Sequence, residues 1–385
     1  MSMSMDMGTP STPRNTCTRS QSASTTASMP MSPVVEILTK QLDAGLNPIR
    51  PEVGVIKTVS VLATASKELL WWLGMPGLWF CNLVRLLLFT FVMLPAFIPV
   101  FIHYLSSPFV VKNVCYGPSI RHQLDVYVPE EDPDAEGEWQ DGGPSERPPR
   151  AKKPVVVFVT GGAWIIGYKA WSLLMGRTFQ KNGVILVSPD YRNFPQGTAQ
   201  TMVKDVTCAL QWVLDHCEEL GGDPDNITVM GQSAGAHLSV LALIEAAEKQ
   251  AKGGAAPWMA GSFARYVGIS GPYDIVKLIP EMHRRGLHKR VLKALMVDPL
   301  DLSPTARMLA IAPAAARLLP PFSLYHGTAD ATVPVQQTKD MAAALKKAKV
   351  VLERVVLMEG KSHTDPILED PASGSDPLMH ELITL

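Results

Sequence analysis

The sequence predicts an α/β fold in which a mostly parallel central sheet is covered by helices on both faces. Two observations support this prediction. From Pro154 onward, short runs rich in β-branched residues recur between segments of helical pattern. Such runs suit strands buried on both faces, and strands that alternate with helices form a parallel sheet. The second observation is a serine motif, GQSAG, placed between one of these runs and a helix.

The expected elements follow one another at regular intervals. We expect strands at 124–128, 154–160, 184–190, 227–230, 266–271, 321–327 and 349–358. Helices are expected between them, most clearly at 201–219 before the Gly221-Gly222 pair and from about Ala234 to Gln250. Together these elements predict one α/β catalytic domain at 111–385.

The composition excludes two classes of protein. The chain has 385 residues, of which 46% are hydrophobic, so it is not disordered as a whole. Its 35 basic and 36 acidic residues leave no basic excess to neutralise phosphates, so we expect no nucleic-acid partner. Charged residues make up 18% of the chain, below the ~25% usual for soluble domains. Either the core is large or part of the chain meets lipid.

The N-terminal part divides into a tail and an apolar region. Residues 1–33 are rich in Ser, Thr and Met and contain no Ile, Leu, Val or aromatic residue, so we expect a disordered tail. Residues 34–110 form a second region, dominated by the apolar run at 69–105. Arg85 is the only formal charge between Leu69 and Ile102 in that run.

The apolar run favours a membrane-associated helical region. Leu86–Ile102 is 17 uncharged residues long, near the lower limit for a membrane span, and contains Pro95 and Pro99. Three tryptophans precede it, as is common at membrane interfaces. Attachment by one span and attachment by a helical hairpin both fit. The alternative is a pair of core or cap helices.

Two further segments interrupt the expected catalytic domain. Residues 130–153 are charged and rich in Pro and Gly, which is typical of an exposed insertion loop. Residues 272–318 are expected to form a helical cap. Its apolar side chains either cover a ligand or simply pack the helices together: Ile275, Val276, Leu278, Ile279, Leu287, Val291, Leu292, Leu295 and Met296.

The GQSAG motif at 231–235 identifies Ser233 as a candidate nucleophile. A GxSxG sequence between a strand and a helix forms a sharp turn that lifts the serine above the sheet at a helix N-terminus. The strand expected at 227–230 precedes the motif, and a helix is expected from Ala234. A nucleophilic serine needs a base, and the base needs an orienting acid.

Asp330 and His363 are the candidate acid and base. In this type of fold the three residues come in the order Ser, Asp, His. Asp330 follows the strand at 321–327, and His363 lies in the loop after the strand at 349–358. Asp365 competes for the acid role, but it stands beside the base. His326 is expected to support the turn that carries Asp330.

The segment TGGAW at 160–164 is the candidate oxyanion loop. It follows the strand at 154–160, where the backbone N–H groups of an HGGG-type loop bind a developing oxyanion. We assign Gly162 and Ala163 as donors, together with Ala234 behind the nucleophile, and Gly161 as a weaker candidate. Thr160 stands where the HGGG pattern has His, a residue that orients the loop without reacting.

No cofactor or metal site is expected. The cysteines form no CxxC pair and no spacing typical of metal ligands. Arg192, in the segment DYR at 190–192, is expected to tie its loop to Asp190 or to another nearby carboxylate.

The motifs resemble those of the α/β-hydrolase fold, on the branch of HGGG-type esterases. Within that fold the chain resembles the plant-type isoprenylcysteine α-carbonyl methylesterases over roughly 104–385, apart from the insertion. The matching blocks are FVTGGAWIIGYKAW, DYRNFPQGT, GGDPDNITVMGQSAGAHLS, LPPFSLYHGTADATVP and GKSHTDPILEDP. TGGAW and GQSAGAH are specific to this group.

The resemblance implies a serine esterase that hydrolyses the methyl ester on C-terminal isoprenylated cysteine. Ser233 would be acylated, His363 would activate water, and Asp330 would hold the imidazole. Prenylated protein C-termini or prenylcysteine methyl esters would be the substrates, and membrane lipid a further partner. The resemblance also implies endoplasmic reticulum and Golgi membranes, with the catalytic domain facing the cytosol.

Three alternatives remain at this point, the third of which is a membrane adaptor whose main function lies in 69–105. The first is another hydrolase of the same fold, a general carboxylesterase or an arylformamidase-like enzyme, because the same triad performs all these acyl transfers. The second is a non-catalytic ligand-binding protein on this fold, which would be expected to lack a triad residue. The sequence retains all three candidates.

Overall fold

The computed structural model describes residues 55–75, 77–130, 151–374 and 377–383. All of them fall in one compact unit. The tail expected at 1–33 and most of the insertion expected at 130–153 lie outside the described residues. The apolar region expected at 34–110 is described from Val55 onward.

The core of the structure is an eight-stranded sheet with strand order β1-β2-β4-β3-β5-β6-β7-β8. β2 pairs antiparallel with both of its neighbours, and the other pairs are parallel. This confirms the predicted mostly parallel sheet; β1 was not among the predicted strands. The strands are β1 Val110–Cys115, β2 Gln123–Tyr127, β3 Lys153–Val159, β4 Ile185–Pro189, β5 Gly222–Gln232, β6 Arg265–Ile269, β7 Phe322–Gly327 and β8 Leu352–Met358.

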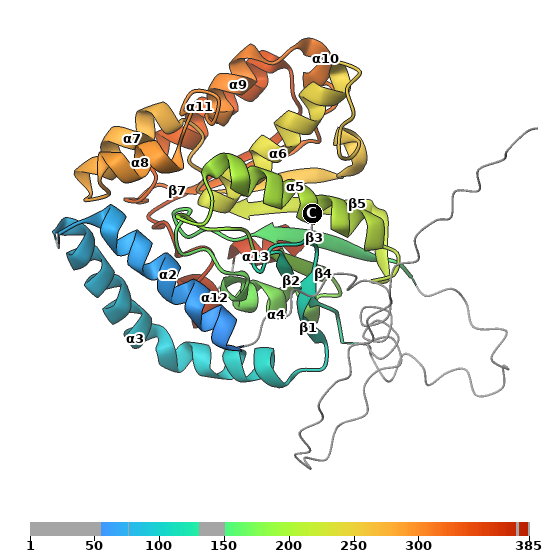
Figure 1. The fold of residues 1–385 in the computed structure, drawn as a ribbon. Coiled ribbons are helices and arrows are strands. Elements are labelled where there is room, and N and C mark those ends of the chain that lie inside the picture. Colours follow the sequence, from blue (N-terminus) through green and yellow to red (C-terminus); the bar gives the residue numbers. More distant parts are fainter. Residues whose placement is uncertain (1–54, 76, 131–150, 375–376, 384–385) are drawn as a thin grey trace, which may run out of the picture. The chain divides into compact units, whose positions relative to one another are not determined.

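Helices cover both faces of the sheet, as Figure 1 shows for α5 and α6 on one face and for α4 and α13 on the other. The helices are α2 Val55–Leu73, α3 Leu78–Ser106, α4 Leu173–Lys181, α5 Ala199–His216, α6 Ala234–Ala251, α7 Ile275–Arg284, α8 Lys289–Leu295, α9 Pro304–Ala310, α10 Pro313–Ala316, α11 Gln336–Ala348, α12 Glu369–Ser373 and α13 Pro377–Ile383.

The sheet separates two hydrophobic cores because successive strand residues point to opposite faces. In β3, Val155, Val157 and Val159 belong to the core beneath α5 and α6, while Val156 and Phe158 belong to the core beneath α4 and α13. These side chains are at most 6% exposed. The continuous apolar run of β3 is therefore explained by burial on both faces.

The end of α3 is built into the second core. Val100 and Tyr104 are less than 9% exposed. The Tyr104 hydroxyl donates a 2.7 Å hydrogen bond to the Asp125 carboxylate of β2, and Lys169 Nζ lies 2.5 Å from the same carboxylate. Both Asp125 and Lys169 are buried. This charged contact fastens the apolar helix to the sheet.

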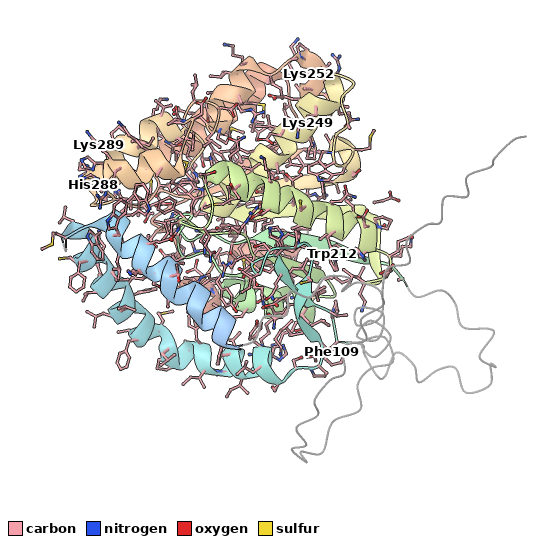
Figure 2. The ribbon with its side chains drawn as sticks, viewed as in Figure 1. Phe109, Trp212, Lys249, Lys252, His288 and Lys289 are labelled. Atoms are coloured by element: carbon pink, nitrogen blue, oxygen red, sulfur yellow. The ribbon has the colours of Figure 1, made fainter. Side chains whose placement is uncertain are left out.

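The turn between α2 and α3 is fastened at the other end, to the α7–α8 region. Arg290 donates to the carbonyl oxygens of Trp71 and Trp72 at the end of α2, and Asn82 Nδ2 donates a 2.8 Å hydrogen bond to the Arg285 carbonyl. Figure 2 marks this region by His288 and Lys289 at the start of α8.

The middle of α3 exposes its apolar side chains. Phe91 and Val92 are each 73% exposed, and the other exposed apolar residues of this stretch are Leu83, Val84, Leu86, Leu87, Leu88, Leu94 and Ile98. Among the described residues no single helix is long and apolar enough to cross a membrane. The bent pair 78–89 and 91–106 meets that requirement by length and composition only.

Helices α7 to α10 occupy the region 272–318 where a cap was expected. Most of its apolar residues pack inward, since Ile275, Leu278, Val291 and Leu295 are at most 2% exposed and belong to the first core. Helix packing is therefore the better account of these side chains. Val276, which is 49% exposed, is an exception.

Candidate active site

Ser233 lies alone between the end of β5 at Gln232 and the start of α6 at Ala234. Its backbone has φ +52° and ψ −121°, a conformation that costs free energy for a residue with a side chain. The backbone is held in place because Ser233 N–H donates a 2.8 Å hydrogen bond to the Ile269 carbonyl. The motif thus forms the sharp strand-to-helix turn that the sequence predicted.

Asp330 and His363 form a direct pair. His363 Nδ1 lies 2.7 Å from Asp330 Oδ2, and the Asp330 side chain is fully buried. The loops meet because Gly327 has no side chain: a Cβ there would lie 2.1 Å from the Lys361 carbonyl oxygen. The bond orients the imidazole so that Nε2 is left for proton transfer.

Asp330 is set up to remain ionised. Thr332 N–H and Val333 N–H donate to its Oδ1 at 2.7 and 2.8 Å, and His326 Nε2 lies 3.2 Å from its Oδ2. Burial alone would raise the pKa of Asp330, but the hydrogen bonds from His326 and His363 outweigh it and hold that pKa well below its usual range.

His326 and Asp365 have the supporting roles. His326 also contacts the Val333 carbonyl at 2.9 Å, so it supports the Asp330 turn as predicted. Asp365 accepts a 2.6 Å hydrogen bond from Ser362 N–H and shapes the loop that carries His363. The geometry therefore favours Asp330 over Asp365 as the acid.

His363 contacts the residue that precedes the serine. Gln232, the residue before Ser233, has its Nε2 3.4 Å from both the Nε2 and the carbonyl oxygen of His363. Among the hydrogen bonds of the described residues there is none between Ser233 Oγ and His363. Such catalytic hydrogen bonds often tighten only when substrate binds.

The TGGAW segment lies against the nucleophile. A Cβ built on Gly161 would lie 3.0 Å from Ser233 Cβ. Ala163 and Trp164 have φ values of +50° and +61°, so two consecutive residues with side chains adopt the left-handed conformation. Strain of this kind concentrates at functional sites.

The predicted oxyanion donors are available. Within the described part of the chain, no hydrogen bond uses the backbone N–H groups of Gly162, Ala163 or Ala234. Ala234 begins α6, so its N–H also stands at the positive end of the helix dipole. Thr160 does not hold the loop through its hydroxyl, which is buried without a partner among the described residues. Its carbonyl instead accepts a 3.0 Å hydrogen bond from Tyr191.

Charged side chains brace the loops behind the site. Arg192 pairs with the buried Asp205, with Nη2 and Oδ1 2.5 Å apart. Of the two predicted alternatives, Asp190 or another nearby carboxylate, the second is therefore the one observed. Asp190 instead faces Arg121 at 3.3 Å. Burial raises the pKa of Asp190 to about 6, although Arg121 and Lys169 oppose the shift.

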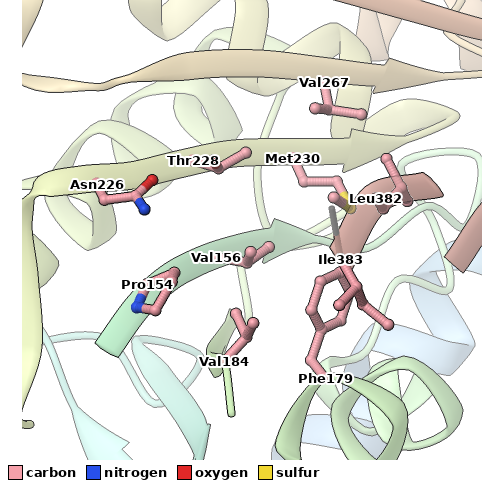
Figure 3. A pocket seen from close by; sticks show the side chains of 10 residues that line it. All are labelled: Pro154, Val156, Phe179, Val184, Asn226, Thr228, Met230, Val267, Leu382 and Ile383. Carbon is pink, nitrogen blue, oxygen red and sulfur yellow. The ribbon is translucent and has the colours of Figure 1, made fainter. Parts of the chain in front are cut away.

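One cavity is unrelated to this site. Strands β3, β5 and β6 and helices α4 and α13 contribute to its lining, as Figure 3 shows: Pro154, Val156, Phe179, Val184, Asn226, Thr228, Met230, Val267, Leu382 and Ile383. Neither Ser233, Asp330 nor His363 lines this cavity. No group of acidic, histidine or cysteine side chains in the described residues could hold a metal ion.

Sequence reasoning missed two residues of this region, His237 and Lys169. His237 lies on α6 and bonds to Trp164 of the oxyanion loop, and Lys169 follows the same loop. The specific block GQSAGAH contains His237, which is the one sequence signal that pointed to it.

Comparisons with known proteins identify the family. Residues 146–345 match the BD-FAE family. An isoprenylcysteine α-carbonyl methylesterase of Arabidopsis thaliana is 38% identical over 325 residues, which cover 83% of this chain and 72% of that protein. A probable isoprenylcysteine α-carbonyl methylesterase of Oryza sativa subsp. japonica is 38% identical over 321 residues, or 82% and 73% of the two chains.

Among solved structures, esterase B from Lactobacillus rhamnosis has the same fold. It aligns with a TM-score of 0.56 over 71% of this chain and 84% of that chain. The sequences are 17% identical, so this likeness concerns the fold alone.

Proposed function

This chain is a carboxylic ester hydrolase that belongs to the isoprenylcysteine α-carbonyl methylesterase family of α/β-hydrolases, and we propose that its substrate is the methyl ester of C-terminal isoprenylated cysteine. The observation that carries the proposal is the Asp330–His363 pair at the Ser233 elbow, in a chain 38% identical to a named methylesterase. Prenylated protein C-termini are then the partners.

The proposed reaction proceeds through an acyl-enzyme. His363 Nε2 takes the proton of Ser233 Oγ as the oxygen attacks the ester carbonyl. The N–H groups of Gly162, Ala163 and Ala234 bind the oxyanion of the tetrahedral intermediate. Methanol leaves with the proton from His363. His363 then deprotonates a water that attacks the acyl carbonyl, and it returns this proton to Ser233 Oγ as the acyl-serine bond breaks and the free acid departs.

The contacts of the candidate site favour ester hydrolysis over a non-catalytic binding role. A binding protein would have no use for a buried, ionised Asp330 that orients a histidine, nor for three unused N–H donors beside a strained serine. The same groups fit a general carboxylesterase equally well, so the prenyl specificity rests on the relatives.

A substrate comparison tests the proposal. We expect kcat/KM for N-acetyl-S-farnesylcysteine methyl ester to exceed that for methyl butyrate by about 10²-fold, because burying a long apolar chain supplies binding energy. Ser233→Ala should abolish both activities, and Ser373→Ala, an exposed serine, should leave them unchanged. Equal rates on the two esters would favour the general carboxylesterase, and faster hydrolysis of an aryl formamide would favour the arylformamidase-like enzyme.

We also propose that the enzyme attaches to endoplasmic reticulum and Golgi membranes through α3, with its catalytic domain in the cytosol. Support comes from the exposed apolar residues in the middle of α3. Both ends of the helix are fastened to the catalytic domain, through Asn82 and Tyr104. A helix of 29 residues, ~44 Å long, held at both ends favours insertion into one leaflet over a span.

Vesicle binding tests the attachment. The double variant Leu87→Glu/Leu94→Glu should lose most of its co-sedimentation with phosphatidylcholine vesicles, because each charge opposes burial in the acyl region. Leu309→Glu/Val351→Glu places the same charges on residues that are 50% and 59% exposed elsewhere, and should bind like wild type. Both variants should hydrolyse a water-soluble ester normally. Undiminished binding of the first variant would contradict the proposal.

A further inference from the structure

His237 is a fully buried histidine that the reaction described above does not use. It lies on α6, four residues after Ser233, and is 0% exposed. Its Nε2 lies 2.7 Å from the Leu302 carbonyl oxygen, which can only accept, so Nε2 carries the proton. Nδ1 is then an acceptor, and Trp164 Nε1–H donates to it at 3.2 Å.

Trp164 belongs to the candidate oxyanion loop and is itself almost fully buried. Its backbone has φ +61°, and that of the preceding Ala163 has φ +50°. Two adjacent strained residues persist only where neighbouring structure holds them. Trp164 is held at two points, since its side chain bonds to His237 and its carbonyl accepts a 2.9 Å hydrogen bond from Phe194 N–H.

We propose that His237 is a positioning residue for ester hydrolysis. By accepting the Trp164 indole N–H and donating to Leu302, it holds the loop in the conformation that presents the N–H groups of Gly162 and Ala163 to the oxyanion. Both ring nitrogens are occupied, so His237 is no alternative base to His363. The inference rests on the proposed roles of Gly162 and Ala163, and not on the prenylcysteine substrate.

The charge state of the ring agrees with this role. Burial lowers the pKa of His237 to about 4, and the hydrogen bond to Leu302 only partly opposes the shift. The ring therefore stays neutral near pH 7, and only the neutral ring can accept from Trp164 while donating to Leu302.

Trp164→Phe is the most direct test, because it removes the indole N–H and keeps an aromatic ring. Loss of a whole oxyanion donor costs ~10²–10³ in rate. Loosening the loop that carries two donors should lower kcat on p-nitrophenyl acetate by about 10-fold, with KM little changed. Affinity for an alkyl boronic acid, which forms a tetrahedral adduct with the serine, should fall by a similar factor.

His237 variants identify the bond responsible. His237→Phe should lower kcat by the same factor as Trp164→Phe, because both remove the same hydrogen bond. For the same reason, kcat of the double variant should be no lower than that of the less active single variant. His237→Gln should regain part of kcat, since its amide both accepts and donates. Trp212→Phe, which changes a buried tryptophan on α5 labelled in Figure 2, is the control and should keep wild-type kcat.

A merely structural role would give a different pattern. It would lower the melting temperature while leaving the kcat per active site, counted with a phosphonate titrant, and the boronic acid affinity unchanged. That pattern, or additive losses in the double variant, would overturn the inference. The water-soluble ester reports on the loop alone, so failure of the prenyl specificity in the substrate comparison leaves this result interpretable.

Discussion

The strand β3 and the helix α3 both carry long apolar runs, yet the side chains of one run are buried and many of those of the other are exposed. Val155 and Val157 of β3 are 0% exposed, whereas Phe91 and Val92 of α3 are 73% exposed. Helices on both faces of the sheet bring apolar sides that cover the strands, but no described part of the chain covers the middle of α3. A run of apolar residues predicts that its side chains will be removed from water. Whether they are buried within the protein depends on which other elements pack against them.

The difference also runs along α3 itself. Its last turns are part of the second core, and Tyr104 bonds to a buried carboxylate. Truncation before Val110 would therefore remove core residues together with the exposed surface. Substitutions on the exposed turns separate attachment from folding, which a deletion cannot do.

The largest expected effect concerns Asp330, which follows the buried strand β7. Asp330→Asn should lower kcat on any ester by about 10⁴-fold, because an amide at this position favours the wrong tautomer of His363. Steady-state kinetics of the purified variant measure the loss. Asp365→Asn is the matched control, and we expect less than about 10-fold there because the Asp365 carboxylate accepts from Ser362 N–H and makes no hydrogen bond with His363 among the described residues. A larger loss in the control would make Asp365 the acid.

The second prediction concerns how the buried His237 makes the stability of the protein depend on pH. His237 has its pKa lowered to about 4 in the folded chain, from the ordinary 6.5. Between these values the unfolded chain binds a proton that the folded chain does not, so stability falls as pH drops from about 6.5 to 4. The loss reaches ~3 kcal/mol in total, at ~1.4 kcal/mol per pH unit.

Urea unfolding at pH 7 and pH 5 measures this effect. Wild type should lose more stability between the two pH values than His237→Gln, which has no such group to protonate. An equal loss in both proteins would mean that His237 does not stay neutral in the folded state.

The candidate catalytic residues could be identified from the sequence for a topological reason. Ser233, Asp330 and His363 each follow a strand, and the carboxyl ends of parallel strands lie along one edge of the sheet. Chain order and strand position were therefore enough to place them together. The strand series was predictable because short runs rich in β-branched residues recur between helical segments. β1 was not predicted, and its pattern VVKNVC is interrupted by two polar residues.

The contacts that fasten the parts together were not predictable. Tyr104, Asp125 and Lys169 come from α3, from β2 and from a short 3-10 helix, and in sequence Lys169 is an unremarkable charge after the glycine loop. Arg290 reaches Trp72 across 218 positions. No local pattern encodes such pairs, because they depend on which elements the folded sheet brings next to each other.

The smallest expected effect comes from comparing a buried residue with an exposed residue in the same turn of α3. Tyr104→Phe removes a hydrogen bond to the buried Asp125 and should lower the free energy of unfolding by about 1–3 kcal/mol. Leu105→Ala, whose side chain is 56% exposed, should stay within about 0.5 kcal/mol of wild type. Urea unfolding in the absence of vesicles measures both. If Tyr104→Phe costs no more than Leu105→Ala, the hydroxyl does not fasten the helix, and α3 is held to the sheet by its apolar contacts alone. If Leu105→Ala costs as much as Tyr104→Phe, the exposed side of this turn is covered in solution, and the contrast between α3 and the strands narrows.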